Sequence, residues 1–196
     1  HMLLTRTYAV KPGTTLLIHG AAGGLGSILV RWGKHLGATV IGTAGSATKA
    51  DIARGYGADH VIVGRDADLV SEVGSLTHGI GVDYTIDGIG GDTLLKSLAC
   101  TRRFGTVASI GQAAGPIPLL AVEEIGPIRS LSLARPSVMA YAADLPSYHQ
   151  AAEALLDVMQ KGVSAEIGRE YPLSDAAQAQ SDLEAGRTTG SLLLIP

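Results

Sequence analysis

The stretch TLLIHGAAGGLG, residues 15–26, runs from a short aliphatic segment into a glycine-rich turn. Its second half, residues 21–26, is a variant of the dinucleotide-binding fingerprint in which Ala21 replaces the first glycine. Leu25, Leu29 and Leu36 then recur at helical spacing. The stretch therefore predicts a strand, a tight turn and a helix whose positive N-terminus attracts a phosphate group.

Further aliphatic runs occur along the chain, and amphipathic segments separate most of them. These runs lie at residues 39–42, 60–63, 82–87, 106–110 and 128–133. Alternation of short strands with helices is typical of a parallel sheet that is covered on both faces. We therefore predict an α/β fold of the Rossmann type, a doubly wound six-stranded parallel sheet.

The second half of the chain ends this repetition. Ser147 and Gln150 form a capping box that predicts the start of a helix ending at Gly162. Its buried face is expected to hold Ala152, Leu155, Leu156 and Met159. We expect His1 and Met2 to be a tag remnant, residues 3–162 to be the Rossmann domain, and residues 163–196 to form a strand–helix–strand tail.

Composition narrows the classes of function. Of the 196 residues, 46% are hydrophobic and 17% are charged, with a net charge of −3, which is unlike disordered chains and nucleic-acid-binding surfaces. The single cysteine, Cys100, excludes an internal disulfide and is expected to be a small core residue. No apolar run approaches the roughly 20 residues of a membrane-spanning helix. We expect a cytoplasmic protein.

The residues after the second predicted strand bear on the choice of dinucleotide. Sites selective for NAD usually place a carboxylate about 20 residues after the fingerprint. Residues 41–46, IGTAGS, contain none, whereas Ser46 offers a hydroxyl and Lys49 an ammonium group. These groups suit the 2′-phosphate of NADP(H), which is the cofactor we predict. The alternative for Lys49 is a solvated helix lysine.

Several phrases of the sequence together resemble the medium-chain quinone oxidoreductases related to zeta-crystallin, and the resemblance covers nearly the whole chain. The phrases are AAGGLG at 21–26, GTAGS at 42–46 with Lys49, YGADHVI at 56–62, DGIGG at 87–91, SIGQ at 109–112, RPS at 135–137 and TTGSLL at 188–193. The resemblance implies a zinc-independent member of the medium-chain dehydrogenase/reductase superfamily. The implied reaction is hydride transfer from NADPH to a small-molecule quinone or another conjugated carbonyl.

The resemblance also implies which residues contact the cofactor. They are Gly23, Gly24 and Leu25 at the pyrophosphate, Gly45, Ser46 and Lys49 at the ribose phosphate, Gly88 at the adenosine, Ser109, Ile110, Gly111 and Gln112 at the nicotinamide, and Arg135, Pro136 and Ser137 along its border. Two positions depart from the family pattern. Gly64 stands where relatives often have a tyrosine, and Gly186 stands where some have an arginine, with Arg187 following it.

The resemblance implies an upstream GroES-like catalytic domain, which we expect to lie outside residues 1–196. We therefore assign no catalytic residue and expect residues 1–196 alone to be inactive. The tail would return to the missing domain, so Leu192 to Ile195 is expected to be mobile, mispacked or paired with a second copy. The family pattern also predicts a homodimer through the last sheet strand, residues 128–133.

Three other interpretations are open at this point. The first is the cofactor domain of a zinc-type alcohol dehydrogenase, and the second is an NADPH-binding structural protein without turnover. A short-chain dehydrogenase is disfavoured because no tyrosine is followed four residues later by lysine. The histidines are too widely spread to predict a metal site, and His19 is expected to pack or to bond the backbone. Neither nucleic acid nor membrane is predicted as a partner.

Overall fold

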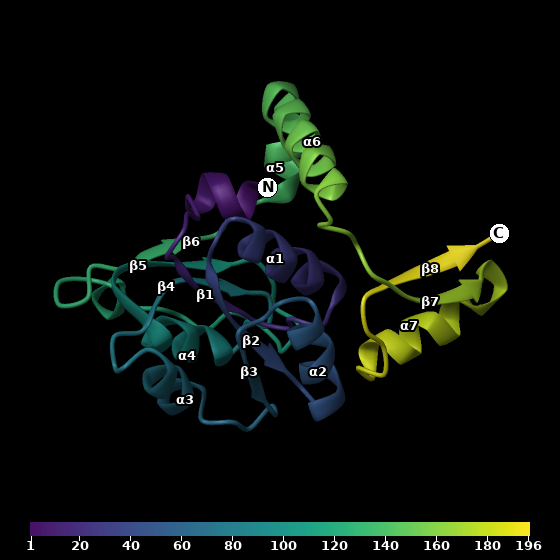
Figure 1. The fold of residues 1–196 in the computed structure, drawn as a ribbon. Coiled ribbons are helices and arrows are strands. Elements are labelled where there is room, and N and C mark those ends of the chain that lie inside the picture. The colour runs from purple at the N-terminus through teal and green to yellow at the C-terminus, as the bar shows by residue number, and fades with distance from the viewer.

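The computed structural model describes residues 1–196, and Figure 1 shows a sheet domain with a smaller lobe beside it. The sheet strands are β1 (Thr15–Ile18), β2 (Thr39–Ala44), β3 (His60–Val63), β4 (Val82–Asp87), β5 (Thr101–Ser109) and β6 (Ser132–Ala134). The longer helices of this part are α1 (Gly24–His35), α2 (Ala47–Gly55), α3 (Leu69–Leu76), α4 (Thr93–Cys100), α5 (Val138–Ala143) and α6 (Leu145–Gln160). A π-helical turn, Met2–Thr7, and a 3₁₀ turn, Val122–Glu124, complete it.

The six strands form one parallel sheet in the order β3-β2-β1-β4-β5-β6. Leu16 of β1 lies between Val40 of β2 and Tyr84 of β4. From β1 the chain first adds β2 and β3 on one side and then adds β4, β5 and β6 on the other side. This is the predicted doubly wound arrangement. In such sheets the crevice for ligands lies at the carboxyl ends of the strands where the order reverses.

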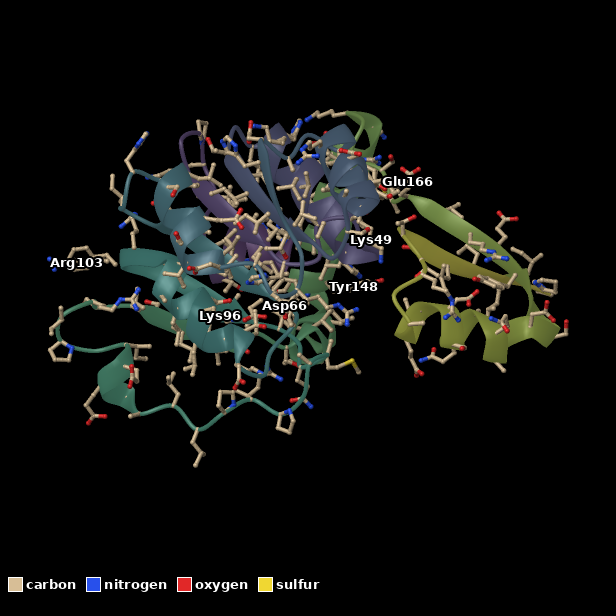
Figure 2. The ribbon with its side chains drawn as sticks, turned by 90° about the horizontal axis from the view of Figure 1, so that it is seen from below. Lys49, Asp66, Lys96, Arg103, Tyr148 and Glu166 are labelled. Carbon is tan, nitrogen blue, oxygen red and sulfur yellow. The ribbon has the colours of Figure 1, made fainter.

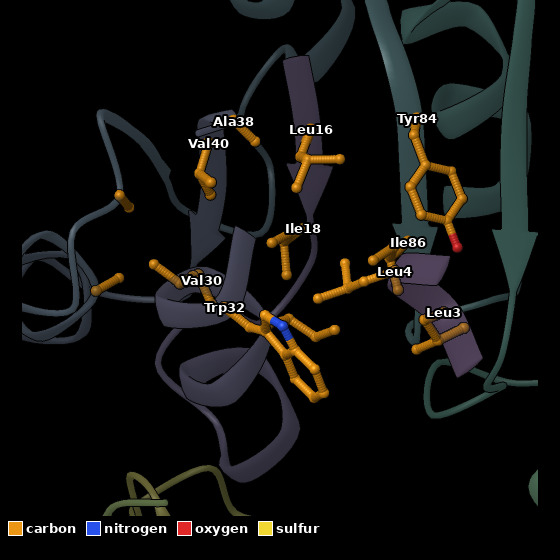
Figure 3. Packing of buried hydrophobic residues seen from close by; sticks show 14 of the residues in the cluster. Leu3, Leu4, Leu16, Ile18, Val30, Trp32, Ala38, Val40, Tyr84 and Ile86 are labelled. Carbon is orange, nitrogen blue, oxygen red and sulfur yellow. The ribbon is translucent and has the colours of Figure 1, made fainter. Parts of the chain in front are cut away.

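The central strand β1 is apolar because both of its faces are covered. Leu16 and Ile18 belong to the cluster that contains Leu4 and Trp32, as Figure 3 shows. Leu17 points to the opposite face and packs in a second cluster with residues of α3. Alternate side chains of a strand point to opposite faces, so burial on both faces explains the continuous aliphatic run. Cys100 is buried in the second cluster, as predicted.

The last sheet strand is shorter than predicted and starts later. The prediction was residues 128–133, whereas β6 covers Ser132–Ala134. Residues 126–131 form a turn instead, in which Ser130 has a positive φ of 51°. The guanidinium of Arg129 donates a hydrogen bond to the carbonyl of Thr101 at 2.7 Å, which draws this segment toward the end of α4. A contact across the fold therefore overrides the local strand preference.

The prediction for α6 was wrong in its start and in its buried face. Asp144, not Ser147, caps the helix: its Oδ2 accepts a hydrogen bond from the Ser147 amide at 3.1 Å. Leu156 is 60% exposed and Met159 46% exposed, while Val158 is buried. Figure 1 shows why, since α5 and most of α6 project away from the sheet. The helical period was right, but the helix packs through a narrower face that includes Val158.

Residues 163–196 form what we call the tail lobe. It contains the parallel strands β7 (Ile167–Pro172) and β8 (Ser191–Ile195), a 3₁₀ turn (Leu173–Asp175) and the helix α7 (Ala176–Glu184). This agrees with the predicted strand–helix–strand order. Figure 1 shows the lobe beside α2, and its far end extends away from the sheet domain. None of the helices in the structure has the length and hydropathy needed to cross a membrane.

Candidate cofactor-binding site

A cavity of about 580 Å³ opens at the carboxyl ends of β1 and β2. Gly20 and Gly23 of the glycine-rich turn line it on one side, and Thr43 and Gly45 line it at the end of β2. Residues 183–184, 186 and 188 of the tail lobe complete the wall. The cavity therefore lies where the topology of the sheet predicts a ligand site.

The helix α1 begins at the edge of this cavity and has no side-chain cap at its N-terminus. Its N-cap residue is Gly23, whereas α2 is capped by Ser46 and α3 by Asp68. The first amides of a helix need acceptors, and an anion can supply them. A Cβ on Gly26 would overlap the carbonyl of Gly20, so glycine here holds the helix against the turn. The turn fits a pyrophosphate on backbone amides alone.

Cations outnumber carboxylates around the cavity. Lys49, Arg65 and Lys96 line it, against a single carboxylate, Glu184. The Glu184 carboxylate already accepts a hydrogen bond from the Gln180 side chain at 2.9 Å. Figure 2 shows Lys49 and Lys96 on different elements of the domain. In a chain of net charge −3 this local excess of positive charge suits an anionic ligand.

A chain of hydrogen bonds lies beneath the glycine-rich turn. Asp87 is fully buried, and its Oδ2 accepts a hydrogen bond from the Ser97 hydroxyl at 2.9 Å. Ser97 Oγ in turn lies 2.9 Å from His19 Nε2. His19 Nδ1 lies 3.2 Å from the hydroxyl of Thr43, which accepts the Gly20 amide proton at 3.2 Å. The network therefore joins β4 and α4 to the start of the phosphate turn.

The network fixes the tautomer of the neutral His19 imidazole. Because the Ser97 proton goes to Asp87, Ser97 Oγ can only accept from the imidazole, so the proton of His19 lies on Nε2. Nδ1 is then free to accept the Thr43 hydroxyl proton. Burial lowers the pKa of His19, although the Asp87 carboxylate acts in the opposite direction. His19 thus bonds side chains, whereas the sequence predicted packing or a backbone contact.

Only part of the predicted cofactor set lines the cavity. Gly23, Gly45 and Lys49 do so. Ser46 lies at its border, where its hydroxyl accepts the Lys49 amide proton at 3.4 Å as the cap of α2. Gly24 and Leu25 lie outside: a Cβ on Gly24 would lie 2.9 Å from Ser191 Oγ of the tail lobe, and Leu25 is half exposed.

The predicted nicotinamide contacts form a second cluster, outside the lining of the cavity. Arg135 Nη1 donates to Ser109 Oγ at 2.9 Å and approaches the Gly111 carbonyl at 3.5 Å. A Cβ on Gly111 would overlap the Gly88 carbonyl, so Gly88 and Gly111 are in close contact. Ile110 and Gln112 flank Gly111, and Pro136 precedes Ser137, the cap of α5. Arg135 thus joins the ends of β5 and β6.

Arg65, Lys96 and Thr43 line the cavity but were missed by sequence reasoning. Arg65 follows the end of β3 by two residues, a position at which parallel sheets often present ligand-binding groups. That spacing was a usable signal. Lys96 lies on the exposed side of α4, and no feature of the sequence indicated that it lines the cavity. Residues 1–196 contain no group of three or more His, Cys, Asp or Glu residues arranged to hold a metal ion.

Comparison with known proteins identifies the family. Residues 24–158 match the family model described as zinc-binding dehydrogenase. The chain is 41% identical over 196 residues to a 2-haloacrylate reductase of a Burkholderia species, covering 99% of this chain and 59% of the relative. It is 38% identical over 199 residues to quinone oxidoreductase 1 of Escherichia coli, covering 100% and 61%. The chain thus spans about 60% of the length of these curated relatives.

Solved structures give the same result. The quinone oxidoreductase of Escherichia coli complexed with NADPH matches with a TM-score of 0.93 at 38% identity, covering 100% of this chain and 61% of that one. A mycobacterial protein complexed with NADPH matches with a TM-score of 0.94 at 38% identity, covering 100% and 62%. The chain therefore belongs to the zinc-binding dehydrogenase family, and the relatives reported above with 38% identity include quinone oxidoreductases.

Proposed function

We propose that this chain is the NADP(H)-binding domain of an oxidoreductase that transfers a hydride from NADPH to a quinone or another conjugated carbonyl. The observation that carries the proposal is the cation-lined cavity beside the N-terminus of α1, which has no side-chain cap. Relatives solved with NADPH support the choice of cofactor. The names of the relatives, quinone oxidoreductase and 2-haloacrylate reductase, support an electron-poor alkene or carbonyl as the acceptor.

The phosphate groups and the nicotinamide end of the cofactor would each meet groups of this chain. The amides at the start of α1 would bind the pyrophosphate, and Lys49 would bind the 2′-phosphate. The Arg135–Ser109 cluster would border the nicotinamide end. When bound, the nicotinamide supplies the hydride. The protein's own contribution is to bind, to orient and to exclude water from the cleft.

Lys49 can bind a phosphate without leaving its present contact. Its ammonium group donates one hydrogen bond to the Gly186 carbonyl at 2.7 Å. A lysine ammonium has three protons to donate, so two remain for an anion. Lys49 would then contact both the cofactor and the tail lobe, so the sheet domain and the tail lobe would both contribute to cofactor binding.

The test is the substitution Lys49→Ala. A charge-assisted hydrogen bond is worth about 1.5–3 kcal/mol, so we expect NADPH binding to weaken by about ten- to a hundredfold. NADH binding is expected to change little, because NADH has no 2′-phosphate. Calorimetry or the fluorescence of the buried Trp32 would measure both affinities. Lys161→Ala removes an exposed lysine of the same charge as a control. Equal losses for NADPH and NADH would contradict the assignment.

We also propose a zinc-independent reaction, a cytoplasmic location and a homodimer. The dimer proposal rests on β6, which is the edge strand of the sheet and pairs only with β5. Its free edge offers backbone groups to the same strand of a second copy. The tail lobe would complete a catalytic domain elsewhere in the protein.

A further inference from the structure

Arg65 is a cation of the cavity wall without a partner of its own. It lies in the turn between β3 and α3, after Gly64, whose φ is +107°. Across residues 1–196 the structure gives its guanidinium no hydrogen bond and no ion pair, even with the adjacent Asp66. Arg31, Arg54 and Arg102, by contrast, all pair with carboxylates. Arg65 therefore has its full donor capacity free to bind a ligand.

The guanidinium of Arg65 lies close to the ammonium of Lys49. A Cβ placed on Gly186 would be 3.4 Å from Arg65 Nη2 and 4.0 Å from Lys49 Nζ, and no other atom outside its chain neighbours lies within 4 Å. Gly186 has a φ of +68° and no side chain, which leaves this space to the two cations. The helix α2 and the turn after the following strand, β3, thus direct positive charge to one point.

Neither Lys49 nor Arg65 forms an ion pair with a carboxylate. Glu184 is hydrogen-bonded to Gln180, and Asp182 pairs with Arg187 at 2.7 Å. Two neighbouring cations repel each other, so the arrangement is stabilised when an anion lies between them. A phosphate monoester carries a charge of about −1.5 to −2 and three acceptor oxygens at neutral pH. An arginine binds such a group through two parallel hydrogen bonds.

We infer that Arg65 is a specificity-determining residue that binds the 2′-phosphate of NADP(H) together with Lys49. The inference rests on the proposed function and extends it to a residue outside the predicted set. Recognition of the phosphate then comes from the turn after β3 and from α2. The tail lobe contributes a carbonyl and open space at Gly186, not a charged side chain.

The test compares Arg65→Gln with the unchanged chain in titrations with NADPH and NADH. Loss of a charge-assisted contact is expected to weaken NADPH binding by about tenfold or more, with NADH changed less than about twofold. Arg65→Lys is expected to restore part of the NADPH affinity, since it keeps the charge but not the bidentate geometry. Arg103→Gln, which removes a positive charge far from Lys49 in Figure 2, serves as the control.

A second readout follows the phosphate itself. The pKa of a free phosphate monoester is about 6, and two cations favour its dianion. The ³¹P resonance of the bound 2′-phosphate is therefore expected to titrate at lower pH in the unchanged chain than in Arg65→Gln. A merely structural role for Arg65 would leave that titration unmoved.

The outcomes separate the two proposals. If Arg65→Gln keeps the preference for NADPH, or loses affinity for NADPH and NADH alike, Arg65 is not the specificity residue and the proposed function stands. If the unchanged chain binds neither dinucleotide, the proposed function fails and this inference fails with it. A loss of preference in Arg103→Gln equal to that in Arg65→Gln would show a general effect of charge and would also overturn the assignment.

Discussion

The strands β1 and β8 have similar sequences, TLLI and SLLLI, but opposite surroundings. Leu16, Leu17 and Ile18 of β1 are fully buried in the sheet domain. In the tail lobe Leu194 and Ile195 of β8 are exposed by 43% and 44%. An aliphatic run therefore predicts that a segment forms a strand, but it does not say which surface covers that strand.

The two regions also hold their buried carboxylates differently. Asp87 of the sheet domain accepts hydrogen bonds from two backbone amides and from the hydroxyl of Ser97. Asp182 of the tail lobe is 6% exposed and is held by the guanidinium of Arg187 and the hydroxyl of Tyr171. The sheet domain uses neutral donors and a close-packed core, whereas the small lobe relies on one charged cluster.

The largest expected difference comes from adding a methyl group at a crowded glycine in each region. In Gly26→Ala the new Cβ would overlap the backbone of Gly20, so we expect the sheet domain to lose about 3 kcal/mol. In Gly168→Ala the Cβ would overlap the Thr189 carbonyl. That change is expected to separate β7 from β8 and to leave the main unfolding transition in place. Denaturant unfolding and amide hydrogen exchange measure the two effects.

Gly74→Ala is the matched control, because a Cβ at this position in α3 has no neighbour within 4 Å. Alanine has a higher helix propensity than glycine, so this variant is expected to gain up to about 1 kcal/mol in free energy of unfolding. The expectation that the two regions unfold separately would be contradicted if Gly168→Ala lowered the stability of the sheet domain as much as Gly26→Ala does. The tail lobe would then be part of one cooperative unit.

The order of elements was predictable because burial on both faces and helical spacing are local properties of the sequence. The strand at 128–133 was misplaced because Arg129 bonds a carbonyl at residue 101, a contact made across the fold. In the site, the glycine-rich turn and Lys49 were predicted from spacing. Arg65 was missed because its importance depends on Gly186, which is distant in sequence and has no side chain.

The charged cluster of the tail lobe predicts a response to acid. Its hydrogen bonds with Arg187 and Tyr171 lower the pKa of Asp182 to about 2, below the roughly 3.9 of an unfolded chain. This contribution to stability is fully present above about pH 5 and is lost as the pH falls through the folded value. We expect hydrogen-exchange protection of β7 to fall between about pH 4 and pH 2.

Asp182→Asn keeps the size of the side chain and removes the charge. The lobe of this variant is expected to be weaker at neutral pH and to lose its dependence on acid in that range. Glu184→Gln, a neighbouring exposed carboxylate, is the control. An unchanged acid response in Asp182→Asn would show that another group governs the lobe.

The smallest change in stability is expected in the sheet domain, near neutral pH. It comes from burial of His19, which disfavours the charged imidazole, whereas hydrogen bonds favour the charged carboxylate of Asp182. Burial lowers the pKa of His19 below its ordinary 6.5, so the folded domain holds the imidazole neutral. As the pH falls below 6.5 His19 binds a proton in the unfolded chain but not in the folded chain, so the free energy of unfolding falls by at most about 1.4 kcal/mol per pH unit.

His19→Asn is expected to remove this dependence of the free energy of unfolding on pH, whereas His35→Asn, at an exposed position, is expected to keep it. Urea unfolding between about pH 7.5 and 5.5 measures the slope. A slope that survives in His19→Asn would mean that Ser97 and Thr43 do not hold a neutral imidazole between them.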